Sequence, residues 1–576
     1  MNTDWQTTYQ TWLSNVDASE RETLIAMSED ERRECFGREL SFGTAGMRGE
    51  VGLGTNRMNL YTVRRATAGL ADYVLSLGEE GKRRGVVVSY DTRRFSKEFS
   101  LAVSEVLSAY GVKSYLFENV RPVPMCSFAV RYLNAAAGVM ITASHNPKEY
   151  NGYKVYGADG AQMAEEGTAK VVAGISNADY FSVPYLPLNL ADVKDGAKLN
   201  EWTTVIGKDV DEAYYGEVLK LTLSPEVTRK RGKDIKLVYT PVHGAGYVPV
   251  TTVLSRLGIS PAVVEGQAMP DTEFSTVRVP NPENADTLAM GMALGDKTGA
   301  DVVLGTDPDC DRMGVAVRDN EGKFVLLTGN QIGLLLLDYV LTRKKELGEL
   351  PKNGAVVKTI VTTTLADRLA NDFGVTVFNV LTGFKYIGEK IKEWEQTGEY
   401  TYLFGYEESY GSLCGTHARD KDAVVACMLF SEMCLYYEEK GMTVYDRLQS
   451  IFGSYGYYIE QNQSVEYKGL DGMEKMANVM KALREKTVEA IGEEKVVSTA
   501  DYKKGIKVYP DGREEKLTLP TTNAMYYELS DRQFVCVRPS GTEPKLKLYV
   551  LVFSDNKEKA TEKANDTMRA IKEILE

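Results

Sequence analysis

Three carboxylates alternate along one short polar stretch, at Asp307, Asp309 and Asp311, directly after an apolar run that is typical of a buried strand. Carboxylates this close repel one another unless a cation holds them, and their oxygens suit Mg²⁺ or Ca²⁺. The calcium-loop pattern fails, because Arg312 and Arg318 stand where a glycine and a bidentate glutamate are required. The stretch therefore predicts a magnesium site of a phosphoryl-transfer enzyme, and the alternative is a solvated acidic turn.

A serine follows another apolar run. Residues 137–141 predict a buried strand, and Pro147 prevents that strand from continuing in a ladder. Ser144 is therefore expected in a tight loop at the carboxyl end of a strand, where open α/β sheets bind ligands. It can act as a nucleophile if a neighbour activates it, although its neighbour in sequence, His145, is not expected to face it well. No Gly-x-Ser-x-Gly elbow surrounds it, which disfavours a hydrolase triad, and the alternative is a turn without chemistry.

Three further polar stretches offer groups that bind parts of a ligand. The glycine-rich residues 41–49 allow a backbone to approach a ligand closely, and Arg48 could bind an anion there. Residues 538–542 combine a guanidinium, two hydroxyls and a glycine, which together can grip a phosphate. Residues 407–409 offer acceptors for vicinal sugar hydroxyls. The alternative for each stretch is a solvated surface turn.

The strands before these loops recur in the order strand, helix, strand. The order occurs over residues 86–141, again over 236–304 and a third time over 355–404, without obvious sequence identity between the three. Such alternation predicts the α/β class with mainly parallel sheets. The last part differs, with strands predicted at 534–537 and 546–553 and a closing helix.

The composition of the 576 residues is that of a globular protein, with 43% hydrophobic and 26% charged residues. A formal net charge of −13 argues against general nucleic-acid binding, but it leaves room for a local basic pocket for a small anion. The seven scattered cysteines form no Cys-x-x-Cys pair, which indicates a reducing compartment with neither a disulfide framework nor a zinc site.

The sequence gives no sign of targeting to a membrane. Residues 1–5 lack a basic segment followed by an apolar one, so no signal peptide is expected. The most apolar run, 332–337, stops at Asp338 and is too short for a membrane span. We therefore expect a cytoplasmic protein without membrane contact.

Taken together, the loops resemble those of the alpha-D-phosphohexomutase superfamily, over nearly the whole chain. The serine, metal, sugar and phosphate loops of that family are matched, in the family's order, by residues 142–147, 307–312, 405–409 and 538–542. The sugar loop departs from the usual Gly-Glu-Glu-Ser by the insertion of Tyr406. Residues 42–49 are similar to the branch that holds long bacterial phosphoglucomutases and phosphopentomutase-like enzymes.

The resemblance implies a fold of three related α/β domains with mainly parallel or mixed sheets, followed by a smaller α+β domain, around a central cleft. The implied domains are 1–205 with the phosphoserine loop, 206–325 with the metal loop, 326–452 with the sugar loop and 453–576 with the phosphate loop.

The resemblance also implies a role for each matching residue. Ser144 would carry a phosphoryl group, and one of its oxygens would join Asp307, Asp309 and Asp311 around Mg²⁺. The groups around the transferring phosphoryl would be Arg48, His145, Lys154, Arg312 and Lys421. The sugar would contact Thr382, Gly383, Lys385, Glu407 and Ser409. The phosphate that does not react would bind Arg538, Ser540, Gly541 and Thr542.

The activity implied is that of an intramolecular phosphotransferase of the isomerase class. We expect interconversion of glucose 1-phosphate and glucose 6-phosphate through a phosphoserine, with glucose 1,6-bisphosphate as intermediate or activator. Phosphopentomutase or phosphomannomutase activity on the same scaffold is the nearest alternative, and a sugar-phosphate phosphatase or a non-catalytic sensor is an alternative of another class. The expected partner is a sugar monophosphate, for a monomer or a dimer.

Overall fold

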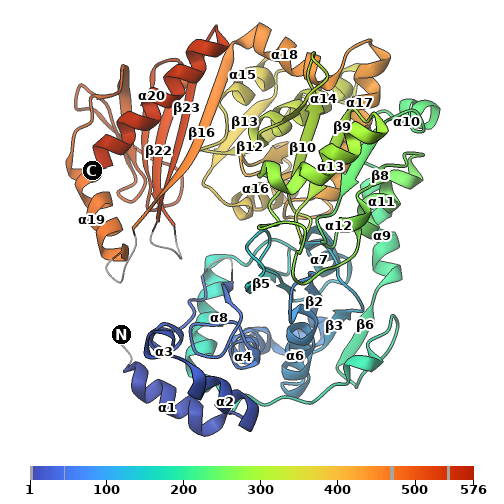
Figure 1. The fold of residues 1–576 in the computed structure, drawn as a ribbon, viewed down its shortest axis with the longest axis vertical. Helices are drawn as coiled ribbons and strands as arrows, with labels where there is room; N and C mark the ends of the chain where they lie inside the picture. Colours follow the sequence, from blue (N-terminus) through green and yellow to red (C-terminus); the bar gives the residue numbers. More distant parts are fainter. Residues whose placement is uncertain (1–3, 44–45, 468–471, 541–544, 576) are drawn as a thin grey trace. The chain divides into compact units, whose positions relative to one another are not determined.

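A computed structural model describes residues 4–43, 46–467, 472–540 and 545–575 (Figure 1). Contacts within the chain group it into two compact units. Unit 1 comprises Met1–Leu336 and Phe384–Gly441, and unit 2 comprises Leu337–Gly383 and Met442–Glu576. Within the described residues, no helix has both the length and the hydropathy needed to span a lipid bilayer.

The first sheet of unit 1 carries the serine loop. Its six strands lie in the order β1 (Met47–Glu50), β5 (Tyr150–Gly157), β4 (Ala137–Ile141), β2 (Val86–Tyr90), β3 (Ser114–Phe117) and β6 (Thr203–Ile206). The apolar strands β2 and β4 are buried along their whole length, because helices cover both faces of the sheet (Figure 1). These helices include α4 (Leu60–Ser76), α6 (Ser96–Ala109), α7 (Val123–Tyr132) and α8 (Glu165–Asn177).

The second sheet of unit 1 carries the metal loop. Its strands lie in the order β11 (Phe324–Leu326), β10 (Met313–Arg318), β9 (Val302–Thr306), β7 (Leu237–Thr240) and β8 (Ala262–Val263). The helices α11 (Tyr247–Arg256), α12 (Glu265–Ala268) and α13 (Ala285–Thr298) alternate with these strands along the chain. The rest of unit 1 holds the paired strands β14 (Thr401–Tyr406) and β15 (Ser412–Cys414), with the helices α16 (Phe384–Thr397) and α17 (Ala423–Glu439).

Each of the three loops in unit 1 joins an antiparallel pair of strands. Strand β4 pairs antiparallel with β5, β9 with β10 and β14 with β15, whereas β2 and β4, like β7 and β9, are parallel. A parallel partner would need a crossover of a dozen or more residues, and loops as short as 307–312 and 407–411 cannot supply one. The sheets of unit 1 are therefore mixed. Of the two arrangements predicted for the α/β fold, mainly parallel or mixed sheets, the structure confirms mixed sheets.

Unit 2 contains a short parallel pair and one antiparallel sheet. Strands β12 (Gly354–Thr359) and β13 (Thr376–Val380) are parallel and are joined through α15 (Leu365–Asp372). Helix α18 (Val444–Tyr455) leads into the larger sheet. That sheet has the order β16 (Tyr457–Glu466), β23 (Lys545–Ser554), β22 (Phe534–Pro539), β21 (Met525–Leu529), β18 (Glu494–Asp501), β19 (Ile506–Val508) and β20 (Glu514–Lys516). Helices α19 (Gly472–Glu485) and α20 (Lys557–Leu575) complete its core.

Candidate active site

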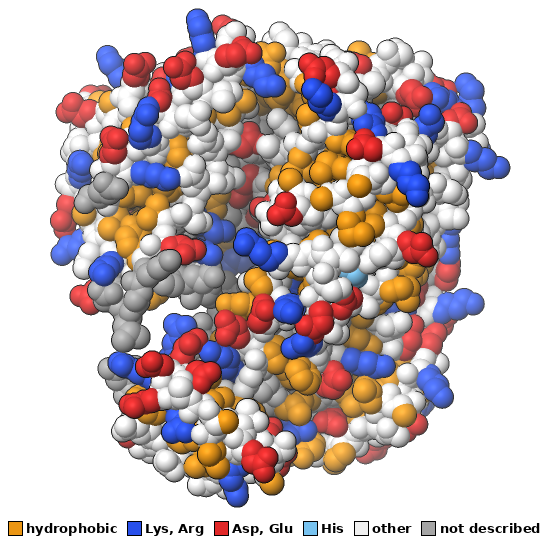
Figure 2. Space-filling model, viewed as in Figure 1, with side chains coloured by type: hydrophobic (Ala, Val, Ile, Leu, Met, Phe, Trp, Pro, Cys, Tyr) orange, Lys and Arg blue, Asp and Glu red, His pale blue; other side chains and the backbone are white. Residues whose placement is uncertain are grey.

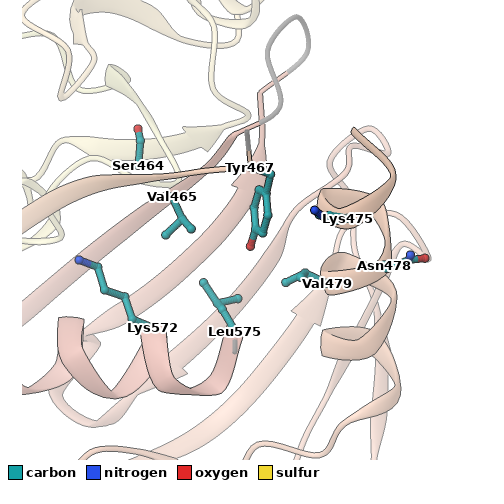
Figure 3. Close-up of a pocket in the computed structure, with 8 residues that line it drawn as sticks. All are labelled: Ser464, Val465, Tyr467, Lys475, Asn478, Val479, Lys572 and Leu575. Carbon is teal, nitrogen blue, oxygen red and sulfur yellow. The ribbon is translucent and has the colours of Figure 1, made fainter. Parts of the chain in front are cut away.

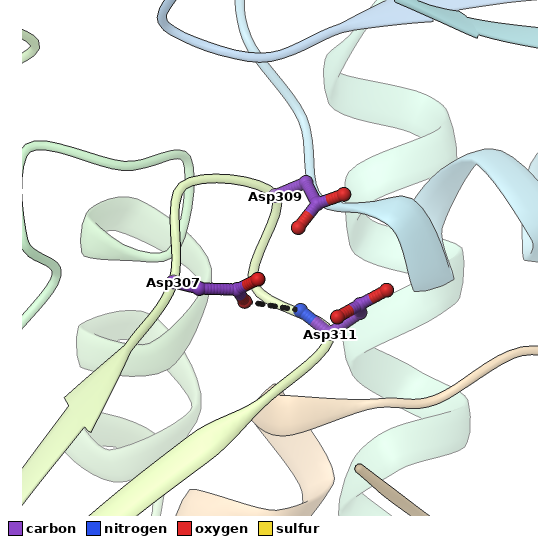
Figure 4. A group of neighbouring side chains, drawn as sticks. All are labelled: Asp307, Asp309 and Asp311. Atoms are coloured by element: carbon purple, nitrogen blue, oxygen red, sulfur yellow. Dashed lines mark hydrogen bonds between the residues drawn. The ribbon is translucent and has the colours of Figure 1, made fainter. Parts of the chain in front are cut away.

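The three aspartates of the metal loop form one buried group. One oxygen of each carboxylate lies within 4.8 Å of the others, and Figure 4 shows the three side chains directed into a common space. Oδ1 of Asp309 and Oδ1 of Asp311 are buried without a hydrogen-bond partner among the described residues. Burial, and then the charges of Asp309 and Asp311, raise the pKa of Asp307 well above its usual range. Buried, unsatisfied carboxylate oxygens of this kind are the ligands that a hard divalent cation prefers, so the donor set fits a metal.

Local packing explains why the metal loop takes this shape. Cys310 has a left-handed backbone, with φ of 50°, and its side chain is fully buried. A Cβ at Gly246 would lie 2.8 Å from Cys310 Sγ and 2.7 Å from Thr306 Oγ1, so only glycine lets the neighbouring segment approach the loop this closely. The amide of Ala245 donates to the carbonyl of Pro308 at 2.8 Å and fixes the loop from the same side.

Ser144 lies against the metal loop. Its hydroxyl donates to Oδ2 of Asp307 at 2.9 Å, and the residue is 3% exposed. The expectation that His145 faces it poorly is wrong, because Nδ1 of His145 lies 3.1 Å from Ser144 Oγ. Ser144 has a left-handed backbone, with φ of 52°, and this turn folds the chain so that the hydroxyl and the following ring meet.

Two buried lysines balance the carboxylates. Nζ of Lys154, from β5, lies 2.9 Å from Asp309 Oδ2, and Nζ of Lys421 lies 3.1 Å from Asp311 Oδ2. Burial by itself would lower the pKa of both ammonium groups, but the adjacent carboxylates outweigh it and raise them. Burial likewise opposes ionisation of Asp309, but Lys154 overcomes this and lowers the pKa of that carboxyl. The site therefore holds fixed charges of both signs at neutral pH.

Three more cationic or titratable residues of the prediction lie around Ser144. Arg312 pairs with Glu283, and Nη1 of Arg48 donates to Asn146 Oδ1 at 2.7 Å. Burial, and then the positive charges of Arg312 and Arg48, hold the pKa of His145 well below its usual range. The imidazole is therefore neutral at neutral pH and can accept a hydrogen bond.

The predicted sugar loop begins next to this group. Glu407 is only 6% exposed, and its amide donates to the carbonyl of Gly411 at 2.9 Å. The carbonyl of Tyr410 accepts from the amide of Met313, which directly follows the metal loop. Tyr406 is the last residue of β14 and fully buried, so Glu407 is the first residue beyond the strand. Ser409 lies half-buried in the same turn, between β14 and β15.

The other predicted residues divide between the units. Lys385, in α16 of unit 1, lies with its Nζ 3.8 Å from Glu165 Oε1. Thr382 and Gly383 follow β13 in unit 2, where Gly383 has a φ of 123° that favours glycine.

The residues predicted to bind the second phosphate lie in unit 2. Arg538 lies in β22 and pairs across the sheet with Lys547. The amide of Ser540 donates to the carbonyl of Lys545 at 2.8 Å, and Gly541 and Thr542 lie outside the described residues.

Sequence reasoning missed Asp91 and Arg93, which support the serine loop. The hydroxyl of Thr142 donates to Asp91 Oδ2 at 2.6 Å and lies 3.1 Å from Asp309 Oδ2. Arg93 donates to the carbonyl of Ser144 and pairs with Asp91 at 3.3 Å. The available signal was their position, since they come directly after the buried strand β2, which lies beside β4 in the sheet.

A groove of about 750 Å³ lies elsewhere, in unit 2, between β16, α19 and α20. Figure 3 shows Val465, Val479 and Leu575 directed into it, with Lys475 and Lys572 at its sides. None of the residues that line it belongs to the predicted site. On the face drawn in Figure 2, Lys and Arg side chains are interspersed with Asp and Glu.

Comparison with known proteins agrees with this geometry. Three family models, described as phosphoglucomutase/phosphomannomutase alpha/beta/alpha domains I, II and III, match residues 39–181, 212–322 and 328–455. A phosphoglucomutase of Staphylococcus haemolyticus is 37% identical over 562 residues, which cover 96% of this chain and 97% of that protein. A phosphoglucomutase of Staphylococcus aureus is 34% identical over 565 residues, with the same coverage of 96% and 97%.

Solved structures show the same fold at lower identity. The open form of pp63/parafusin, a phosphoglucomutase from Paramecium, superimposes with a TM-score of 0.65 at 19% identity, covering 93% of this chain and 95% of that one. A phosphoglucomutase/phosphomannomutase family protein from Burkholderia thailandensis gives a TM-score of 0.63 at 18% identity, covering 92% and 96%.

Proposed function

The chain belongs to the phosphoglucomutase/phosphomannomutase family, and we propose that it interconverts glucose 1-phosphate and glucose 6-phosphate through a phosphoserine at Ser144. One observation carries the proposal: a buried serine hydroxyl lies 2.9 Å from a carboxylate of a three-aspartate group. The phosphoglucomutases of Staphylococcus haemolyticus and Staphylococcus aureus, 37% and 34% identical, favour glucose over mannose or pentose phosphates as the substrate. The reaction class is that of an intramolecular phosphotransferase, an isomerase.

We infer that Asp307, Asp309 and Asp311 hold Mg²⁺ together with an oxygen of Ser144. A bound Mg²⁺ would supply positive charge that neutralises the transferring phosphoryl group. Lys154 and Lys421 keep the surrounding carboxylates compensated. The side chains of the protein contribute positioning and a preorganised electrostatic field. Because these groups are already oriented, solvent does not have to rearrange as charge moves during the transfer.

The transfer itself exchanges one phosphoester for another. The bond between phosphorus and Ser144 Oγ breaks as a bond to a sugar hydroxyl oxygen forms, the proton of that hydroxyl passes to Ser144 Oγ, and glucose 1,6-bisphosphate results as the intermediate. Return of the other phosphate to Ser144 releases the isomer. While the hydroxyl of Ser144 is not phosphorylated, it donates its one hydrogen to Asp307, and a neutral His145 protonated at Nδ1 can donate to Ser144 Oγ. Arg48 and Arg312 add positive charge around the same atoms.

Two further sets of residues are proposed to bind the sugar and the second phosphate of the substrate. We propose that Glu407 and Ser409, together with Thr382, Gly383 and Lys385, contact the sugar. Arg538, Ser540, Gly541 and Thr542 would bind the phosphate that is not reacting, through a guanidinium fork and hydroxyls. Four domains with boundaries after 205, 325 and 452, a cytoplasmic location and a monomeric or dimeric state complete this proposal.

A substrate comparison tests the function. Purified protein with Mg²⁺ and a trace of glucose 1,6-bisphosphate is given glucose 1-phosphate, mannose 1-phosphate or ribose 1-phosphate, and both isomer and free phosphate are measured. We expect the highest kcat/KM with glucose 1-phosphate and almost no free phosphate. A higher kcat/KM with the mannose or ribose phosphate would assign the alternative mutase. Free phosphate equal to the substrate consumed would indicate a phosphatase, and binding without turnover a sensor.

A further inference from the structure

A buried phenylalanine in the segment 269–279 has an unusual backbone for its type. Phe274 is 1% exposed although it lies in a loop, between α12 and α13. Its φ is 45°, in the left-handed region that residues other than glycine seldom adopt. Such a conformation persists only where the surroundings impose it. The contacts of this ring therefore show what the segment is held against.

Phe274 lies against the arginine that supports the serine loop. The guanidinium carbon of Arg93 is 5.2 Å from the centre of the Phe274 ring, and the Arg93 side chain is fully buried. Arg93 donates to backbone carbonyls along the whole loop, those of Ser144, Asn146, Pro147 and Tyr150. Its hydrogen bonds to these carbonyls and its ion pair with Asp91 fix the path of the loop backbone.

The same segment is tied to the support of the metal loop. Nδ1 of His243 lies 3.0 Å from the carbonyl oxygen of Met269, and its Nε2 lies 2.8 Å from Thr276 Oγ1. Two residues after His243, the amide of Ala245 donates to the carbonyl of Pro308 in the metal loop. A continuous path of contacts therefore runs from the metal loop through residues 269–276 to the serine loop.

The exposed rim of this segment also reaches the serine loop, but it adds little energy. Glu273 lies 3.1 Å from Lys148 Nζ and pairs with Arg94. The side chains of Lys148 and Glu273 are 45% and 35% exposed, and ion pairs this exposed contribute little to stability because water and salt screen them. The buried contact between Phe274 and Arg93 is therefore the part of the segment that can hold the loop.

We propose that Phe274 and Arg93 are positioning residues, which keep the serine loop in register with the metal loop when Ser144 is phosphorylated. The inference rests on the proposed function. One direct link between the loops is the hydrogen bond from Ser144 Oγ to Asp307, and a phosphoserine has no hydroxyl hydrogen to donate. A second contact, Thr142 Oγ1 at 3.1 Å from Asp309 Oδ2, shares its one hydroxyl hydrogen with Asp91 Oδ2 at 2.6 Å. The path through Phe274 and Arg93 does not use the hydroxyl of Ser144, so phosphorylation removes none of its contacts. A misplacement of 1 Å in such a site can cost about 100-fold in rate.

The test compares two phenylalanines that share a left-handed backbone. Phe274→Ala removes the ring that covers Arg93, and Phe95→Ala is the matched control, because Phe95 has a φ of 61° but is 50% exposed and stacks on Phe99. We expect Phe274→Ala to lower kcat about 10- to 100-fold with little change in KM, and to increase amide hydrogen exchange over 144–150. Phe95→Ala should leave both unchanged.

A rescue variant and a double mutant separate positioning from general destabilisation. Phe274→Leu keeps an apolar cover and should recover most of kcat. Arg93→Lys keeps the charge but lacks the fork that reaches several carbonyls, so this single variant should already lower kcat. Adding Phe274→Ala to it should cause little further loss of kcat. If Phe274→Ala does not fold, Arg93→Lys decides the matter, since unchanged kcat in that variant overturns the proposal. Additive losses, or a fall in kcat that tracks only the unfolded fraction, would overturn it as well.

The exchange measurement keeps this inference distinct from the proposed function. If wild-type protein does not interconvert glucose phosphates, the proposed function fails, but protection of residues 144–150 still reports whether Phe274 holds the loop. If wild type is active and Phe274→Ala matches it in both kcat and exchange, the positioning role fails and the proposed function stands.

Discussion

The hydroxyl oxygen of Ser144 and Oδ2 of Asp307 lie 2.9 Å apart, although 163 positions of sequence separate the two residues. Each follows the carboxyl end of a buried strand, β4 or β9, in a different sheet of unit 1. The pair joins the residue expected to accept a phosphoryl group to the residues expected to hold the cation.

Ser144→Ala should lower turnover by at least about 10³-fold, because the variant has no oxygen to accept the phosphoryl group. Binding of the sugar phosphate, measured by calorimetry, should remain. Intact-mass measurement of wild type should show a phosphorylated fraction that maps to Ser144. The control is Ser176→Ala, an exposed serine of α8 that should keep both activity and the mass shift. A phosphate that maps to another residue would end the assignment of Ser144.

Asp309→Asn should weaken Mg²⁺ binding and lower kcat by about 100-fold or more, because it removes one ligand charge and leaves buried Lys154 with only its more distant carboxylate partner, Asp311. Metal titration and steady-state kinetics provide the measurement. Asp296→Asn, which changes an exposed carboxylate beside Arg318, is the control and should change neither. Chelation should abolish wild-type activity and added Mg²⁺ should restore it, so full activity after chelation would contradict the metal site.

Glu407→Gln should impair both directions of the reaction about tenfold or more, because a charged acceptor for sugar hydroxyls becomes a neutral one. The phosphorylated fraction of Ser144, measured by mass, should not change. Rates are measured from glucose 1-phosphate and from glucose 6-phosphate. A loss confined to one direction would place Glu407 elsewhere in the reaction.

Arg538→Ala should raise KM for the sugar phosphate about tenfold or more, because a charged hydrogen bond to phosphate is worth roughly 1.5–3 kcal/mol. Arg538→Lys should rescue poorly, since lysine keeps the charge but lacks the fork. The control Arg569→Ala changes an arginine of α20 that pairs with Asp566, and it should leave KM unchanged. Unchanged kinetics in Arg538→Ala would refute the phosphate clamp.

Gly246→Ala should lower both the melting temperature and the affinity for Mg²⁺. Its Cβ would lie 2.6 Å from Tyr239 Oη and 2.8 Å from Cys310 Sγ, and such overpacking typically costs about 1–3 kcal/mol. Gly216→Ala is the control, because a Cβ there meets nothing within 4 Å and lies within helix α9 (Lys208–Leu219). That change should raise stability by up to about 1 kcal/mol. Equal effects of both variants on the melting temperature would contradict this account.

The sequence by itself determined the loops and the strands before them. Strongly apolar runs such as 137–141 and 302–304 form strands because burial on both faces demands continuous apolar side chains. Pro147 marks the end of a ladder, and three alternating aspartates favour a bound cation, because carboxylates this close repel one another. These signals are local, so composition and spacing were sufficient to predict the serine loop, the metal loop and the α/β class.

Tertiary structure decided how the loops meet. The left-handed backbone of Ser144 brings His145 to its hydroxyl, and the return of β5 beside β4 makes the sheet mixed. The bonds from Arg93 to four carbonyls and the approach of Phe274 join segments far apart in the chain. No local pattern encodes such contacts, because each depends on the free energy of packing two distant segments together. Residue types and spacing thus determined what chemistry was available, and long-range packing decided which of those groups touch.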